Sequence, residues 1–267
     1  MPIPRDDPAP TRSPADDLAL ALALADVADR LTMERFLAAD LQVSTKPDDT
    51  PVTDADREVE RRMRAILEEH RPGDAVLGEE QGGRIEGRTW VLDPIDGTKN
   101  FLRGVPVWAT LIGLVDGEVV PVGVVSAPAL GRRWWAAIGQ GAWTRALAAA
   151  PRRCRVSAVD ALDDAFVTYS SRGGWSGRPE HIDRLLDRCW RSRAFGDFWS
   201  YMLVAEGACD IATEPELAVH DMAALVPIVV EAGGWFTDLD GRPGPFGGSA
   251  MATNGVLHEA AEAALRA

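Results

Sequence analysis

Hydrophobic and polar positions along the first part of the chain predict two long helices. A Leu- and Ala-rich helical pattern with acids in its first turn begins at Ser13 and Pro14 and continues to about Ala39. A second helix is predicted over about 54–70, between a Thr-x-x-Asp capping sequence and a terminating His-Arg-Pro-Gly sequence. The Leu/Ala repetition has the period of a helix that packs on a core.

Short apolar runs after the second helix predict a meandering antiparallel sheet. Residues 108–115 and 118–126 flank Asp116-Gly117, a dipeptide typical of a two-residue hairpin turn. Residues 134–138 and Trp143 extend the same sheet. We expect the first half of the chain to pack two helices on this sheet.

Strands and helices alternate in the second half, which is typical of an α/β layer. The expected order is strand 165–170, helix 180–190, a strand near 193–195, helix 198–208, strand 210–213, helix 222–233, strand 235–237, and a last strand and helix. The Ala-, Pro- and Arg-rich segment 145–153 predicts a linker. We expect a disordered tail over 1–12, an N-terminal α+β subdomain over 13–150 and a C-terminal α/β subdomain over 151–267.

The most informative chemistry lies in residues 90–101. A short apolar strand ends there at two carboxylates three residues apart, Asp93 and Asp96, with a proline that stiffens the turn between them. Gly97 and Thr98 then open a predicted helix. Paired acids bind a hard cation through oxygen, and the free amides of a helix start bind an anion. A cation site beside an anion site is the chemistry of phosphate esters.

Three further acidic pieces fit such a site. Glu79 and Glu80 end another short apolar run, and alone they would be interpreted as a solvated loop. Asp56 caps the second helix, and in a functional interpretation it also accepts a proton from a hydroxyl near the metals. Asp221 stands at the cap of the helix predicted over 222–233, where a carboxylate can also hold a metal.

Together these pieces resemble the inositol monophosphatase-like family of metal-dependent phosphomonoesterases, from about Asp16 to the C-terminus. The matching sequences are Gly78-Glu79-Glu80, the run 90–98, and His220-Asp221 with Ala223-Ala224, with smaller echoes at 52–57 and 252–255. The chain departs from the family at His220, where Trp is usual. The resemblance implies an α/β fold with α+β layering, an αβαβα sandwich.

The resemblance also implies a metal centre of two to three Mg²⁺ ions, with Mn²⁺ as an alternative. Glu79, Asp93 and the backbone carbonyl of Ile95 would hold a first ion that binds the attacking water, which makes Glu79 catalytic as well. Asp93, Asp96 and Asp221 would hold a second ion that stabilises the leaving alkoxide. A third, weaker ion would lie near Glu79. Oxygen ligands with room for water select Mg²⁺.

Catalysis and phosphate binding are expected at the turn after the second acid of the central motif. By resemblance, Thr98 paired with Asp56 would take the proton from the nucleophilic water, and the amides of Gly97 and Thr98 would cradle the phosphate. Lys99 and Lys46 are the only lysines of the chain. Lys99 is a candidate phosphate contact, and Lys46 belongs to a loop that would close over the site.

Within the family, the sequence is most similar to bacterial histidinol-phosphate phosphatases. The similar segments are 71–74, 96–101, 126–135 and 196–198. The leaving group of such a substrate carries a positive amine, so we expect Glu214 and Asp197 to meet an amine or imidazole, with Arg193 bracing that strand and Asp221 also facing the substrate. The alternative for these acids is an ordinary solvated surface.

Two other functions stay open at this point. An inositol monophosphatase or a broader sugar-phosphate phosphatase would share every metal residue. A non-catalytic binding protein could keep the fold, and the loss of one metal carboxylate would favour it, yet all of them and Thr98 are present.

Composition restricts the partners. The net charge of -13 and the pI of about 4.8 argue against nucleic acid and against an anionic membrane surface. Bound divalent metals would still make an anionic ester acceptable. The cysteines, Cys154, Cys189 and Cys209, have no metal or redox spacing and indicate reduced thiols in a cytoplasmic protein. No secretory signal is recognisable, and the family suggests a homodimer, with Trp134-Trp135 as either interface or core.

Overall fold

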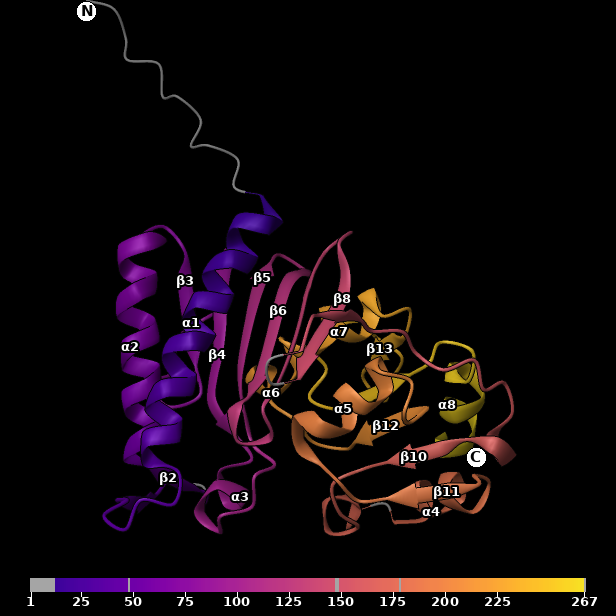
Figure 1. Cartoon of the computed structure of the whole chain (residues 1–267). Coiled ribbons are helices and arrows are strands. Elements are labelled where there is room, and N and C mark those ends of the chain that lie inside the picture. The colour runs from indigo at the N-terminus through magenta and orange to yellow at the C-terminus, as the bar shows by residue number, and fades with distance from the viewer. Residues whose placement is uncertain (1–12, 48, 147–148, 178, 267) are drawn as a thin grey trace, which may run out of the picture.

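The structure is a computed structural model, and it describes residues 13–47, 49–146, 149–177 and 179–266. These residues form five layers in the order helix, sheet, helix, sheet, helix (Figure 1), so the predicted αβαβα sandwich is confirmed. The predicted tail over 1–12 lies outside the described residues. Among the described helices, none combines the length and the apolar character that crossing a membrane requires.

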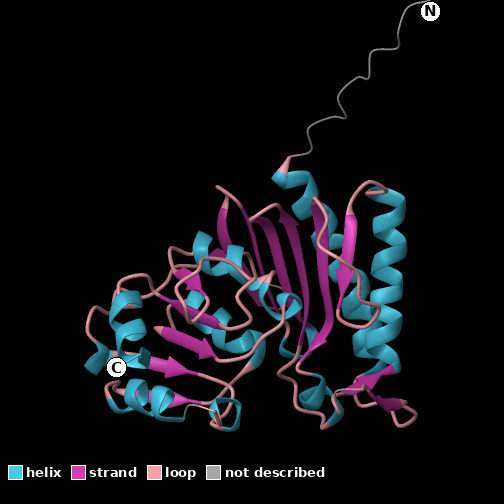
Figure 2. Ribbon diagram, turned by 180° about the vertical axis from the view of Figure 1, so that it is seen from behind, coloured by secondary structure: helices cyan, strands magenta, loops and turns pink. Residues whose placement is uncertain are grey.

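The first layer and the first sheet come from the first half of the chain. Helices α1 (Pro14–Arg35) and α2 (Asp54–His70) pack on one face of a seven-stranded sheet, on the side away from the C-terminal layers (Figure 2). Its strands, in spatial order, are β3 (Ala75–Gly78), β4 (Arg88–Asp96), β5 (Ala109–Asp116), β6 (Val119–Ala127), β7 (Arg132–Ala137), β8 (Gly141–Ala146) and β9 (Arg152–Arg153). All neighbours are antiparallel except β3 and β4. A small hairpin, β1 (Val43–Thr45) with β2 (Pro51–Thr53), precedes α2.

The remaining layers come from the second half. Helices α5 (Asp197–Ala205), α6 (Val219–Met222) and α7 (Leu225–Glu231) lie between the two sheets, and α4 (Pro179–Asp187) and α8 (His258–Arg266) form the outer layer. The second sheet has the order β11 (Arg191–Arg193), β10 (Phe166–Thr168), β12 (Ile211–Glu214), β14 (Ala250–Thr253) and β13 (Trp235–Thr237). Among the described residues, the 3-10 helix η1 (Pro128–Leu130) joins β6 to β7 in the first sheet, η2 (Leu162–Asp164) precedes β10, and η3 (Gly173–Trp175) lies between β10 and α4.

Several sequence predictions need correction. The helix predicted over 222–233 is two helices, α6 and α7, because Pro227 lacks the N–H that a continuous helix would need at that point. The first helix ends at Arg35, since Leu37 adopts a left-handed conformation with φ of 65°. The linker predicted over 145–153 begins in β8 and ends in β9. The subdomain division near residue 150 stays a prediction.

The cores support this layering. Trp134 is fully buried in the core between the sheets, and Trp135 is half-buried and packs against the core under α1 and α2. The three cysteines are free. The junction of α6 and α7 lies directly on the first sheet, because a Cβ atom at Gly123 would be 2.2 Å from the carbonyl oxygen of Ala224. This close approach brings Asp221 to the end of β4.

A bulge at the end of β4 aims the site residues. Asp93 pairs with Leu111 and Asp96 pairs with Ala109, so the two residues between the acids on β4 oppose the single residue Thr110 of β5. In a regular strand, residues three apart point to opposite faces, and one inserted residue turns them to the same face. The hydroxyl of Thr110 donates to the Pro94 carbonyl at 2.8 Å and holds the bulge.

Candidate active site

Three carboxylates meet where β4 and α6 converge. Asp93, Asp96 and Asp221 each offer an oxygen, and these atoms all lie within 4.8 Å of one another. Asp221 is the third residue of α6, and its carboxylate also accepts the amide of Ala218 at 2.7 Å. The sequence prediction placed Asp221 at the cap itself, whereas Ala218 is the cap residue. Asp221 thus fixes the start of α6 and faces the other two acids.

The electrostatics of this cluster fit a cation. Burial and the charges of Glu79, Asp96 and Asp221 raise the pKa of Asp93 well above its ordinary value. Burial and neighbouring acids likewise raise the pKa values of Asp96 and Asp221. One oxygen of Asp93, Oδ1, is buried with no hydrogen-bond partner among the described residues. Like charges at this distance are stable together only when neutralised, and a divalent cation does that.

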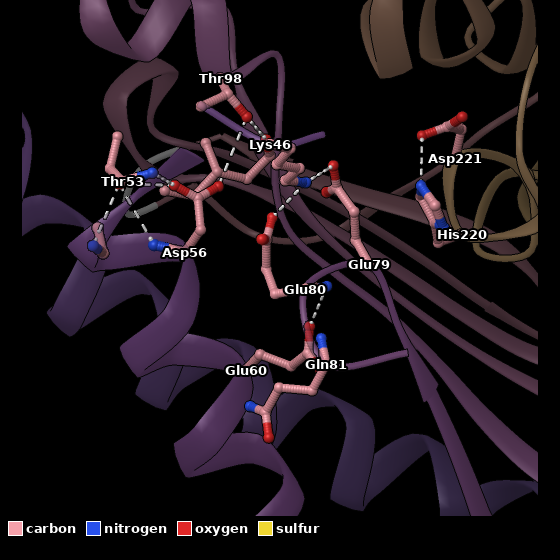
Figure 3. Close-up of polar contacts among 12 residues, drawn as sticks. Lys46, Thr53, Asp56, Glu60, Glu79, Glu80, Gln81, Thr98, His220 and Asp221 are labelled. Atoms are coloured by element: carbon pink, nitrogen blue, oxygen red, sulfur yellow. Dashed lines mark hydrogen bonds and ion pairs between the residues drawn. The ribbon is translucent and has the colours of Figure 1, made fainter. Parts of the chain in front are cut away.

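Glu79 and Glu80 lie beside this cluster and share one ammonium group. The Lys46 Nζ is 2.7 Å from an oxygen of each (Figure 3). Burial acts to lower the pKa of Lys46, but the two carboxylates outweigh it and raise that pKa above its ordinary value. Burial, with the charge of Glu79, raises the pKa of Glu80 to about 7. Lys46 therefore provides positive charge beside Glu79, which was predicted to bind the first metal, and beside its neighbour Glu80.

Thr98 and Asp56 are brought together as predicted. The Thr98 hydroxyl donates to the Ile95 carbonyl at 2.9 Å and lies 3.5 Å from the Asp56 carboxylate (Figure 3). Asp56 also accepts the hydroxyl and the amide of Thr53, at 2.6 Å and 2.8 Å, in the capping box of α2. Burial is the main cause that raises the pKa of Asp56 to about 6, and Glu79 adds to it. Capping and proton acceptance are compatible because different oxygens serve them.

The turn after Asp96 requires a glycine at its first residue. Gly97 has φ of 87° and precedes the short helix α3 (Thr98–Leu102). A Cβ atom at Gly97 would lie 3.1 Å from the Val107 carbonyl oxygen and 3.3 Å from an oxygen of Asp197. A side chain there would therefore crowd the cavity as well as strain the backbone.

Two adjoining cavities, of about 460 Å³ and 630 Å³, open over the acids. Both are lined by Thr50, Lys99, Ser170, Asp197 and Asp221. The smaller one also contacts Glu79, Gly97, Thr98 and His220, and the larger one contacts Asp96, Tyr201 and Glu214. Predicted metal, phosphate and leaving-group residues thus line two cavities that share a wall, although Asp93, Ile95 and Arg193 line neither.

The two acids of the leaving-group side are shielded from solvent to different degrees. Glu214 is buried and Asp197 is half-buried, so Glu214 does not lie on a solvated surface. Glu214 accepts the Ser170 hydroxyl at 2.6 Å, and burial raises the pKa of Glu214 to about 7. Asp197 is held by Asn100 Nδ2 at 3.3 Å; burial and the charge of Asp221 raise its pKa to about 6, against the attraction of Lys99. These acids can meet a cationic group in the cavity.

Arg193 lies elsewhere. It ends the edge strand β11, is exposed, and donates to the carbonyl of Ser192 at 2.8 Å. It is not among the described residues that line the two cavities. The structure therefore does not place its side chain with Glu214 and Asp197.

Sequence reasoning missed three residues of the site. Ser170 follows the end of β10, and its position at a strand end was an available signal. Tyr201 is in the apolar face of α5, where nothing separates it from an ordinary core residue. Glu60 on α2 lies under the Glu79 loop, and its sequence context is that of a solvated helix face.

The comparisons with known proteins decide the family. The model of the inositol monophosphatase family matches residues 13–267. The chain belongs to the inositol monophosphatase family. It is accordingly a phosphomonoesterase of a metal-dependent family, as the sequence predicted.

Named relatives agree with this assignment. A histidinol-phosphatase of Mycobacterium tuberculosis is 60% identical over 248 residues, which cover 91% of this chain and 95% of that protein. A histidinol-phosphatase of Streptomyces coelicolor is 55% identical over 251 residues, covering 91% of this chain and 94% of that protein. An inositol monophosphatase structure from Zymomonas mobilis is 34% identical, with a TM-score of 0.84, over 96% of this chain and 100% of that one.

Proposed function

We propose that this phosphomonoesterase hydrolyses L-histidinol phosphate to L-histidinol and phosphate with Mg²⁺, in the cytoplasm and as a homodimer. The carrying observation is that two acids, the buried Glu214 and the half-buried Asp197, line the cavity that Asp96 and Asp221 also line. Withdrawing carboxylates from water costs free energy unless a cation or a proton compensates them. The amine of histidinol phosphate would supply that charge, whereas inositol would not. The two relatives at 55–60% identity are named histidinol-phosphatases, which supports the same substrate.

The residues present fit the metals. Glu79, Asp93 and the Ile95 carbonyl would hold one Mg²⁺, and Asp93, Asp96 and Asp221 would hold a second, with a third, weaker ion near Glu79. Bound Mg²⁺ would supply charge neutralisation and an activated water. All of these ligands are oxygen atoms, which favours Mg²⁺, with Mn²⁺ as the alternative.

Residues of the chain itself would transfer the proton and bind the phosphate. The Thr98 hydroxyl has two acceptors, the Ile95 carbonyl and the Asp56 carboxylate. An Ile95 carbonyl that binds a metal would be a weaker hydrogen-bond acceptor for the Thr98 hydroxyl. Asp56 would then take the proton of that hydroxyl, and the Thr98 oxygen would accept a proton from the attacking water. The amides of Gly97 and Thr98 and the ammonium of Lys99 would bind the phosphate oxygens.

Phosphate release from histidinol phosphate and from inositol 1-phosphate, measured side by side with Mg²⁺, tests the proposal. A chelator and the Asp93→Asn variant serve as controls. We expect a strong preference for histidinol phosphate. A preference for inositol 1-phosphate would keep the metal chemistry and reject the substrate. Light scattering of the purified protein tests the homodimer, and a monomeric mass would reject it.

A further inference from the structure

The loop that carries Glu79 and Glu80 rests on one buried carboxylate from another element. Glu60 of α2 is fully buried. Its Oε2 accepts the amide of Glu80 at 2.7 Å, and its Oε1 accepts the amide of Gln81 at 3.1 Å (Figure 3). Hydrogen bonds from amides to an ionised carboxylate are about twice as strong as neutral ones. Both oxygens of Glu60 are therefore committed to the backbone of this loop.

Arg64, one helical turn further along α2, ties the same carboxylate to both sides of the loop. Its Nε donates to Glu60 Oε1 at 2.7 Å. Its terminal nitrogens donate to the carbonyl of Gly82 and, at 3.4 Å, to the carbonyl of Val76. Arg64 thus neutralises the buried charge of Glu60. Together the two side chains hold the backbone on both sides of Glu79 and Glu80.

The close approach of the loop to Glu60 requires a glycine. A Cβ atom at Gly78 would lie 2.2 Å from Glu60 Oε1 and 2.6 Å from Oε2. No larger residue fits there while the loop keeps its contact with the carboxylate. The glycine before the acid pair is explained by this contact, since the backbone conformation of Gly78 is one that other residues adopt.

We propose that Glu60 is a positioning residue of the metal centre. It holds the backbone of residues 79–81 so that the Glu79 carboxylate is presented to the cation, and it acts only through that backbone. Lys46 contacts the side chains of Glu79 and Glu80, so the loop is held by its backbone from α2 and by its side chains from the β1–β2 hairpin loop. The inference rests on the proposed role of Glu79 as a metal ligand.

The Glu60→Gln variant tests this inference. The variant has almost the same shape, but its NH₂ group would face one of the two loop amides, so one hydrogen bond is lost and two donors oppose each other. Residues behind metal ligands typically contribute about 10- to 100-fold to metal affinity. We expect the Kd for Mg²⁺, measured by calorimetry, to rise by about this factor, with the activation curve moved to higher Mg²⁺ and kcat at saturation little changed.

Hydrogen exchange in chelator gives a second readout that needs no metal. The amides of Glu80 and Gln81 should exchange faster in Glu60→Gln than in the wild type. Glu58→Gln is the matched control, because Glu58 is on the same helix, is exposed and pairs with Arg61. Its Mg²⁺ affinity and loop exchange should equal those of the wild type.

Three results would separate the possibilities. A folded Glu60→Gln protein with the wild-type Kd for Mg²⁺ would overturn the inference, even if its melting temperature fell. If Glu60→Gln does not fold, Arg64→Met removes the second half of the same clamp, and an unchanged Kd in that variant overturns the inference equally. A wild type that binds no Mg²⁺ would instead reject the proposed function.

Discussion

The hydroxyl oxygen of Thr98 lies 3.5 Å from a carboxylate oxygen of Asp56, although the two residues belong to different elements, α3 and α2. The second Asp56 oxygen is committed to the capping box with Thr53. The capping box therefore fixes the carboxylate in the orientation that faces Thr98. One side chain both starts a helix and offers a proton acceptor to the site.

Removing the Thr98 hydroxyl should slow hydrolysis and leave the metal centre intact. Thr98→Val keeps the volume of the side chain, and we expect kcat to fall by about 10²- to 10⁴-fold, the usual effect of losing a proton-transfer group. Steady-state phosphate release and Mg²⁺ calorimetry would be measured together. A variant with wild-type kcat would exclude Thr98 from proton transfer, and one that binds no Mg²⁺ would show a ligand-holding role instead.

The Asp93→Asn variant should be more stable than the wild type in chelator but less stable than the wild type in Mg²⁺. In chelator the variant should melt above the wild type, because it removes one of several buried like charges. In Mg²⁺ at 100 times the Kd, the wild type gains about 2.7 kcal/mol and the variant gains much less. Thermal melts in both buffers check this. Asp163→Asn, at an exposed acid of η2, should follow the wild type, and a wild type unaffected by Mg²⁺ would contradict the prediction.

Local signals made much of this fold predictable. The capping sequence at 53–56 and the Pro-Gly after residue 70 gave both ends of α2, because caps and terminators act within one turn. The Asp-Gly turn gave the β5–β6 hairpin for the same reason. The proximity of Asp93, Asp96 and Asp221 was predictable because their sequence contexts resemble those of a known family. That they bind metal stays a prediction.

What the sequence could not show depends on contacts between distant segments. The bulge that turns Asp93 and Asp96 to the same face arises from pairing with β5, which no local pattern reports. Glu60 has the sequence context of a solvated helix position, and only the packing of the 79–82 loop on α2 makes it a buried anchor. The sequence prediction placed Arg193 beside Glu214 and Asp197, whereas in the structure its side chain is exposed and donates to the carbonyl of Ser192.

The two leaving-group acids should determine which ester is hydrolysed. In an Asp197→Asn, Glu214→Gln double variant, kcat/KM for histidinol phosphate should fall by about 10²-fold or more, because hydrogen bonds to charged groups contribute about 1.5–3 kcal/mol each. The rate with p-nitrophenyl phosphate, which has no cationic group, should stay within a few fold of the wild type. Equal losses on both esters would indicate damage to the metal centre, and unchanged kinetics with histidinol phosphate would reject the role of both acids.

Glu214 should also make the metal-free protein lose stability as the pH rises. Its pKa is about 7 in the folded protein, mainly through burial, against an ordinary value of 4.5. Between these two values the folded state binds more protons than the unfolded state, so the free energy of unfolding falls with rising pH. Glu214→Gln cannot titrate but can still accept the Ser170 hydroxyl. Relative to the wild type, its free energy of unfolding should therefore rise from about pH 4.5 to 7 and level off above that.

The measurement is urea unfolding in chelator at several pH values, with the difference between Glu214→Gln and wild type plotted against pH. The full shift would correspond to at most about 3 kcal/mol, since one pKa unit is about 1.36 kcal/mol. Glu216→Gln is the matched control, because Glu216 is two residues away and exposed, and it should follow the wild type throughout. A Glu214→Gln difference that is constant with pH would mean that Glu214 titrates normally, and the argument that a buried acid there awaits a cationic leaving group would lose its electrostatic basis.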